Sequence, residues 1–221
     1  SDGCGTILKI DDFAHVTLLT GASEIGQGSE TVLAQLVCEE LGLPLEAVTV
    51  VNNDTDITPW DVGVHASRTT FIGGNSALGA ARKAKAKILT AAAKVTGLPE
   101  AELELRAGHV VKAGSGEAIM NLAKLLRSLH FSDKAELVMT THYYEPPSKH
   151  QTREYKGDVS AAYAWATQVV EVEGVADAGD DVLALGVDEE VAVGLVLARR
   201  RVAGEAHPRA RLGVAVAEHH R

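Results

Sequence analysis

The sequence has few of the residues that mark several classes of protein. Only 4% of its 221 residues are aromatic, and it has two cysteines, Cys4 and Cys38. Two thiols supply neither a disulfide framework nor the ligand spacing of a zinc or iron–sulfur site. No run of roughly 18 apolar residues occurs, so we expect no membrane-spanning helix. The chain begins without Met and without a basic and apolar leader, which predicts a processed, trimmed or partial chain with no secretory signal.

The charge that is present is mainly acidic. A formal net charge of −9 argues against nonspecific nucleic-acid binding, which requires a basic surface. With 46% hydrophobic residues, the chain has enough apolar material for one large domain or two small ones. We therefore predict a protein of the reducing cytoplasm that has neither a nucleic acid nor a membrane as its partner.

Hydrophobic periodicity predicts an α+β fold with mixed β/α layers, in which two long helices pack on sheets. Gly42 and Gly97 are placed to end these two helices, and Pro44 and Pro99 prevent their continuation. The expected strands cover residues 6–10, 15–20, 47–51, 136–143 and 163–173, with a hairpin around 107–109, and the expected helices cover 30–41, 75–96 and 118–129.

A Gly-rich segment, Gly26-Gln27-Gly28-Ser29, opens the first long helix. Backbone N–H groups at a helix N-terminus attract anions, and flanking glycines let a ligand approach the backbone closely. Ser29 is expected to cap the helix. A short motif of this kind is also compatible with an ordinary strand–turn–helix junction, in which the glycines serve only the backbone.

A second polar segment, from Val64 to Ser76, precedes the second long helix. If the segment is extended, Ser67 and Thr69 lie on the same side and both hydroxyls can reach one ligand. The alternative is a polar loop with Asn75 as the helix N-cap. Two such loops, separated by one strand, favour a shared ligand crevice. A noncatalytic α/β anion-binding module that uses the two helix N-termini is the alternative function.

No residue is assigned as a metal ligand or a catalytic group. Asp54 and Asp56 lack the glycine and the distal glutamate of a calcium-binding loop, and the histidines show no ligand spacing. Ser67 has no recognisable base partner, which makes a nucleophilic hydrolase a weak hypothesis.

Several collinear segments resemble the molybdenum hydroxylases, the xanthine dehydrogenase and aldehyde oxidase family. The likeness covers residues 1–173, and within the family it is strongest to the type of the 4-hydroxybenzoyl-CoA reductase α subunit. The segments that carry it are Thr20–Thr31 with its Gly-Gln-Gly motif, Asn53–Phe71, Tyr144–Pro147 and Gly157–Glu173.

The resemblance implies a molybdopterin-binding large subunit of an oxidoreductase, with molybdenum held on a pterin that is often the cytosine dinucleotide. By this resemblance Gln27 donates from its amide near a molybdenum ligand, and Gly26 and Gly28 let the backbone approach the cofactor. Ala66, Ser67 and Thr69 would contact the pterin or phosphate part. Iron–sulfur clusters and FAD are expected on partner subunits. The substrates would be small molecules: aldehydes, N-heterocycles or aromatic CoA esters.

The sequence also departs from the family. The family's catalytic base lies in a Gly-Glu-Pro segment that this sequence lacks, so we expect no activity from the chain alone. Residues 174–221 contain no lysine and are rich in Ala, Val and Arg, and our hypothesis is an out-of-frame or diverged translation of GC-rich DNA. The predicted organisation is therefore a molybdopterin-binding subdomain portion (1–144), a connection and the start of a second subdomain (145–173), and a divergent tail (174–221).

Overall fold

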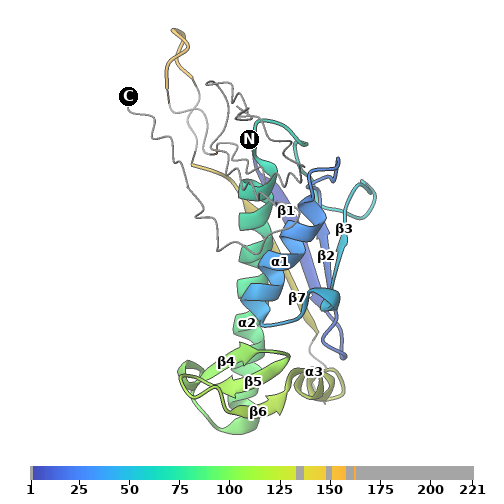
Figure 1. The fold of residues 1–221 in the computed structure, drawn as a ribbon, viewed down its shortest axis with the longest axis vertical. Helices are drawn as coiled ribbons and strands as arrows, with labels where there is room; N and C mark the ends of the chain where they lie inside the picture. The colour runs from blue at the N-terminus through green and yellow to red at the C-terminus, as the bar shows by residue number, and fades with distance from the viewer. Residues whose placement is uncertain (1, 133–136, 148–150, 158–161, 163–221) are drawn as a thin grey trace, which may run out of the picture. The chain divides into compact units, whose positions relative to one another are not determined.

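The part of the chain that the computed structural model describes contains three α-helices and two β-sheets (Figure 1). The larger sheet is mixed and the smaller one is antiparallel. The described residues are 2–132, 137–147, 151–157 and 162. They fall within one compact unit, Ser1–Tyr163. The strand expected at 163–173 and the tail 174–221 lie outside the described residues, and the predicted domain boundaries stay predictions.

The larger sheet has four strands in the order β3-β2-β1-β7. β1 (Cys4–Ile10) pairs antiparallel with β2 (Val16–Thr20) and with β7 (Val138–Tyr144), whereas β2 pairs parallel with β3 (Val48–Val51). These strands confirm the expected ones to within a few residues. Because β2 and β3 are parallel, their carboxyl ends lie at the same edge of the sheet, and the segments that follow them leave the sheet together.

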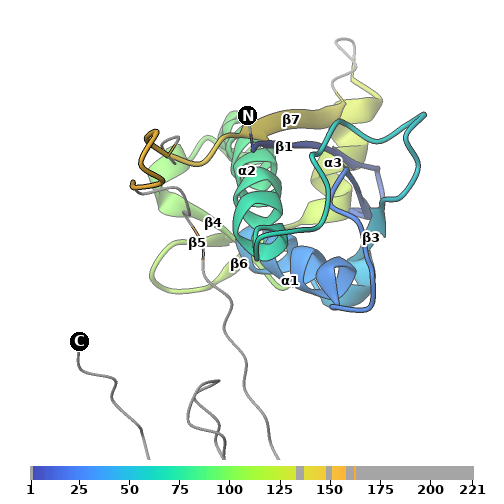
Figure 2. The ribbon, with the colours of Figure 1, turned by 90° about the horizontal axis from the view of Figure 1, so that it is seen from above.

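The crossover between β2 and β3 is made by helix α1 (Ser29–Leu41), which packs against α2 (Gly74–Thr96). Both helices lie over one face of the large sheet, with α2 in contact with β1 and β7 and α1 nearer β3 (Figures 1 and 2). Small side chains on the buried face of α2 allow close packing on the strands. The core between helices and sheet includes Leu8, Val16, Leu18, Leu33, Val37, Leu41, Ala77, Ala80, Ala81, Ala84 and Ile88.

The predicted helix ends are confirmed. Gly42 adopts a left-handed conformation with φ of 63°, and its N–H donates to the Cys38 carbonyl, as expected for a C-cap. Gly97 does the same at the end of α2, where its N–H donates to the Ala93 carbonyl. Short 3-10 turns follow both caps, at Leu45–Ala47 and Glu100–Glu102.

The smaller sheet has the strand order β4-β5-β6 and is followed by helix α3 (Leu122–His130). The hairpin expected around residues 107–109 is confirmed by β4 (Leu103–Arg106) and β5 (His109–Lys112). The third strand, β6 (Ala118–Asn121), was predicted to be helical, and that prediction is wrong.

The boundary between β6 and α3 has a clear local cause. β6 pairs with β5, so residues 118–121 gain ladder hydrogen bonds that the sequence period does not reveal. The Asn121 side chain then accepts from the Lys124 N–H and caps the helix. Leu122, Leu125 and Leu126 are fully buried against the core. None of the helices in the described part of the chain is long and apolar enough to cross a membrane.

Candidate functional site

Two loops leave the large sheet at the edge where β2 and β3 end. We call residues 21–28 the first loop and residues 52–68 the second loop. The bases of the two loops are joined, because the Asn52 amide donates to the Ala22 carbonyl over 3.2 Å. The second loop is also joined to the start of β1, where Asp61 forms an isolated bridge with Cys4. The Gly5 N–H donates to the Trp60 carbonyl over 3.1 Å. The carboxyl edge of parallel strands is where α/β sheets commonly bind ligands.

The first loop closes around a carboxylate. One Glu24 oxygen, Oε1, accepts from the N–H groups of Gly26 over 2.6 Å and Gly28 over 3.0 Å. The other, Oε2, accepts from the Ser29 hydroxyl over 3.1 Å and from the Glu30 N–H over 3.2 Å. Glu24 therefore occupies the N-terminus of α1 and neutralises the partial positive charge there.

These contacts stabilise the ionised form of Glu24. The N–H of Gly28, followed by those of Glu30 and Gly26 and by the Ser29 hydroxyl, lowers the pKa of the Glu24 carboxyl to about 2. Ser29 was expected to cap α1, and this is wrong: the N-cap is Gly28, without a side-chain cap, and Ser29 is the first helical residue. Because Glu24 already uses these donors, the observation counts against an anion site at this helix end.

Gln27 lies at the exposed tip of the first loop. Its Nε2 donates to the Ser23 carbonyl over 2.9 Å, and its Oε1 accepts from the Ile25 N–H over 2.7 Å. An amide nitrogen carries two hydrogens, so one is not used by Ser23. Gly26 and Gly28 have φ of 101° and 80°, and a Cβ at either would meet no atom within 4 Å among the described residues. The backbone on both sides of Gln27 is thus open to a ligand.

The second loop is anchored by Arg68, whose side chain is 3% exposed. Its guanidinium forms a two-pronged ion pair with Asp61, with Nη1 to Oδ1 at 2.8 Å and Nη2 to Oδ2 at 3.0 Å. It also pairs with the Asp2 carboxylate at 3.0 Å. The remaining donors reach the carbonyls of Asp2, Gly3 and Gly63. Arg68 thus joins the start of the chain to Asp61 and Gly63 in the second loop.

Burial alone would lower the pKa of Arg68, but the carboxylates of Asp61 and Asp2 outweigh burial and raise it. The neighbouring Cys4 thiol is an acid, so burial raises its pKa instead of lowering it. Burial, together with the Asp61 carboxylate, raises the pKa of Cys4 to about 12. Sequence reasoning missed Arg68 and Asp61 because no motif links these two residues, which are seven apart, and because the other partners of Arg68, the Asp2 and Gly3 carbonyls, lie 66 and 65 residues away.

Ala66, Ser67 and Thr69 do not form the extended segment that we expected. Ala66 and Ser67 have φ of 49° and 58°, so both adopt the left-handed region and reverse the chain, and both are exposed. Thr69 is 7% exposed and begins a π-helical turn, Thr69–Gly73, that runs directly into α2. The prediction that the Ser67 and Thr69 hydroxyls share one side is therefore wrong, because it required a straight backbone.

The start of α2 also differs from the expectation. The Gly74 N–H is already bonded to carbonyls of the π-helical turn, and the Ile72 N–H donates to the Arg68 carbonyl over 2.7 Å. Asn75 is not the N-cap; its side-chain amide donates to the Phe71 carbonyl over 2.7 Å. The donors around Gly73 and Gly74 are therefore used internally. The alternative function was an anion-binding module that uses the two helix N-termini. Neither of its expected positions offers a free donor within the part of the chain that the structure describes.

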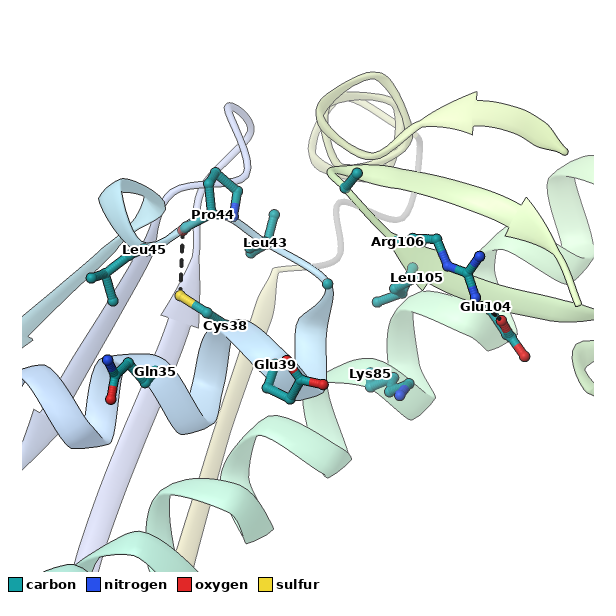
Figure 3. Close-up of a pocket in the computed structure, with 12 residues that line it drawn as sticks. Gln35, Cys38, Glu39, Leu43, Pro44, Leu45, Lys85, Glu104, Leu105 and Arg106 are labelled. Carbon is teal, nitrogen blue, oxygen red and sulfur yellow. Dashed lines mark hydrogen bonds and ion pairs between the residues drawn. The ribbon is translucent and has the colours of Figure 1, made fainter. Parts of the chain in front are cut away.

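A separate pocket of about 900 Å³ opens at the other end of α1, between that helix, the start of the smaller sheet and α2 (Figure 3). Lys85 and Arg106 line it together with Glu39 and Glu104, and the Cys38 thiol donates to the Pro44 carbonyl over 3.3 Å. None of the six predicted site residues lines this pocket. Within the described ranges, no group of three or more His, Cys, Asp or Glu residues is placed to hold a metal ion.

Comparison with known proteins assigns the family. The family described as molybdopterin cofactor-binding domain matches residues 1–185. The chain belongs to this family. The predicted α+β fold and the resemblance to the molybdenum hydroxylases are thereby confirmed. The match ends beyond residue 173, inside the region that we expected to diverge, and the boundary at 173 stays a prediction.

Relatives of this molybdopterin-binding chain are much longer proteins. A putative xanthine dehydrogenase molybdenum-binding subunit of Escherichia coli is 37% identical over 108 residues, 48% of this chain and 14% of that protein. The carbon monoxide dehydrogenase large chain of Afipia carboxidovorans is 30% identical over 144 residues, 64% of this chain and 18% of that protein. The crystal structure of a Cu,Mo-CO dehydrogenase matches with a TM-score of 0.60 and 29% identity, over 66% of this chain and 19% of that chain. The chain therefore spans less than a fifth of the length of these relatives.

Proposed function

We propose that the chain is a segment of the molybdopterin-binding subunit of a molybdenum-dependent oxidoreductase, and that the first and second loops hold the cofactor between them. The observation that carries this proposal is the open backbone at Gly26 and Gly28 in a chain of this family. An uncharged amide, Gln27, lies between these two glycines. When bound, the cofactor supplies the redox chemistry, while the chain supplies hydrogen bonds and shape.

Each predicted site residue has a definite part in this proposal. Gln27 donates its remaining amide hydrogen to the cofactor near the metal, and Gly26 and Gly28 admit the cofactor to the backbone. Ala66 and Ser67, which are exposed in their left-handed turn, contact the pterin or phosphate part. Thr69, which begins the π-helical turn, contacts the same part of the cofactor.

The finer aspects of the function rest on the resemblance. We propose the cytosine dinucleotide form of the cofactor, and aldehydes, N-heterocycles or aromatic CoA esters as substrates, with the 4-hydroxybenzoyl-CoA reductase type as the nearest. Iron–sulfur and FAD subunits would be the partners, in the cytoplasm. One relative is named as subunit gamma of a dehydrogenase complex, and another as a large chain, which supports a multi-subunit assembly. Without the Gly-Glu-Pro segment, the chain alone would not turn over.

Cofactor loading tests the proposal. The 221-residue chain would be produced in a host that makes molybdopterin, and the molybdenum content and the fluorescence of the oxidised pterin would be measured per chain. We expect metal and pterin in comparable amounts, and less of both in Gln27→Ala, which removes the proposed donor. A folded chain that carries neither metal nor pterin would contradict the proposed function. Equal loading of Gln27→Ala would contradict the role of Gln27.

A further inference from the structure

Glu24 stands out because it combines full hydrogen bonding with a position beside the proposed cofactor contact. Both of its carboxylate oxygens accept two hydrogen bonds each, at distances between 2.6 and 3.2 Å. Two of the four donors, the N–H groups of Gly26 and Gly28, belong to the residues on either side of Gln27. Hydrogen bonds to an ionised acceptor are stronger than neutral ones, so this carboxylate fixes the backbone around Gln27.

Gln27 bonds back to the backbone around Glu24. Its Nε2 donates to the carbonyl of Ser23, the residue before Glu24, and its Oε1 accepts from the N–H of Ile25, the residue after it. The two side chains therefore hold each other's backbone in a reciprocal arrangement. Release of the Glu24 carboxylate would leave the glycines on both sides of Gln27 free to change conformation, since glycine restricts the backbone less than any other residue.

The geometry points to Glu24 as a positioning residue for the cofactor: its carboxylate holds residues 26–30 so that the Gln27 amide is presented in one orientation, while Glu24 itself does not touch the cofactor. This inference rests on the proposed function, because it concerns the same site. It also explains why an acidic residue is compatible with a site for an anionic cofactor. The four donors around Glu24 satisfy its charge within the loop, and the uncharged amide of Gln27 lies at the exposed tip.

The test uses Glu24→Gln, which keeps the size of the side chain. It replaces one carboxylate oxygen, which accepts two hydrogen bonds, by an NH₂ group that cannot accept them. Glu30→Gln is the matched control. It also removes one negative charge near the N-terminus of α1. The Glu30 side chain is not what bonds to Glu24: the backbone N–H of Glu30 does so, and the variant retains it. Both variants would also be made in the Gln27→Ala chain, so that the coupling between the two positions can be measured.

The first readout is cofactor content per chain. We expect Glu24→Gln to lower molybdenum and pterin content about tenfold, as for loss of hydrogen bonds to a charged group, and Glu30→Gln to change it less than about twofold. In the Gln27→Ala chain, Glu24→Gln should lower the content by less than about a further twofold, because the residue that it positions is already absent. Undiminished loading of Glu24→Gln, or fully additive losses, would overturn the inference.

The second readout, amide hydrogen exchange on the chain without cofactor, separates this inference from the proposed function. Glu24→Gln should speed exchange at Gly26, Gly28 and Glu30 and leave the strands β1 and β2 unchanged. Unchanged exchange at these three amides would overturn the positioning role even if the wild-type chain loads cofactor normally. If the folded wild-type chain loads no cofactor, the proposed function fails, and the role of Glu24 toward the cofactor fails with it.

Discussion

The first and second loops leave the same edge of the sheet, but they are held in place in opposite ways. A partly exposed carboxylate, Glu24, closes the first loop with hydrogen bonds that all lie within seven residues of sequence. A buried guanidinium, Arg68, closes the second loop with partners up to 66 residues away. The contacts of Glu24 are therefore local, and their loss should affect the candidate site. The contacts of Arg68 are tertiary, and their loss should affect the fold.

The difference in burial determines the expected energetics. A group in contact with water loses little when its partner is removed, because water replaces the missing hydrogen bonds. The side chains of Arg68 and Asp61 are 3% and 2% exposed, so removal of Arg68 would leave Asp61 as an uncompensated buried charge. Variants in the second loop should thus change stability first, and variants in the first loop should change cofactor binding first.

The largest effect is expected from Arg68→Met. This change leaves the Asp61 carboxylate buried without its cation, and we expect the free energy of unfolding to fall by about 3–5 kcal/mol. Urea denaturation followed by circular dichroism measures it. Asp61→Asn in the Arg68→Met chain should recover part of the loss, because the amide removes the buried charge and still accepts from the Gly63 N–H. A loss of less than about 1 kcal/mol would show that Arg68 does not anchor the second loop.

The Cys4 thiol reports on the same anchor. Its pKa of about 12, against an ordinary value of 9.0, lowers the thiolate fraction at pH 8 about a thousandfold, and burial slows access further. In a Cys38→Ala chain, a disulfide reagent should therefore release its chromophore only as fast as the protein opens. Arg68→Met in that background should accelerate the reaction strongly. Rapid labelling of Cys4 in the chain with intact Arg68 would contradict the burial of the Cys4 side chain.

Gly21→Ala tests the point at which the two loops touch. A Cβ at Gly21 would lie 2.5 Å from both the Asp61 Cβ and the Pro59 carbonyl oxygen, which is too close to be accommodated without movement. We expect a loss of about 1–3 kcal/mol in thermal or urea unfolding, typical of overpacking. Gly74→Ala, whose Cβ would approach only the flexible end of the Leu36 side chain, is the control and should cost less. Equal losses would mean that the loops are not in tight contact at Gly21.

The smallest effect is the pH dependence that Glu24 confers. Its folded-state pKa of about 2 lies below the ordinary value of 4.5, so its stabilising contribution is complete above about pH 4.5 and is lost as the pH falls toward 2. The difference in unfolding free energy between wild type and Glu24→Gln should follow this course. A difference that disappears already near pH 4.5 would show that the four hydrogen bonds to Glu24 do not form in solution.

Local patterns predicted the parts of the fold that depend on neighbouring residues. The spacing of Leu33, Val37 and Leu41, followed by Gly42, defined α1 almost to the residue. Local patterns failed where pairing with distant residues decides the structure. Residues 118–121 carry a helix-compatible pattern but form β6, because β5 offers a pairing edge. The parallel pairing of β2 with β3 and the position of β7 beside β1 likewise have no local signal.

The same distinction holds at the candidate site. Gln27 and its flanking glycines were found from sequence because the motif is contiguous. Arg68 was missed because Asp2, Asp61 and Gly3 become its partners only after folding. Glu24 was missed for a subtler reason: its acceptor role depends on the positive φ angles at Gly26 and Gly28, which turn their N–H groups toward it. The predicted arrangement of Ser67 and Thr69 on one side was wrong, because the sequence does not show that the chain reverses at Ala66 and Ser67.

The most direct test is an amide hydrogen exchange map of the chain with and without bound molybdopterin. If the two loops hold the cofactor, exchange should slow on loading at residues 25–29 and 65–69, and Gln27→Ala should reduce both effects together. The pocket at the far end of α1, around Cys38, Glu104 and Arg106, should not change. Slowed exchange at this pocket, with both loops unchanged, would contradict the proposed site and place the cofactor at the opposite end of the helix.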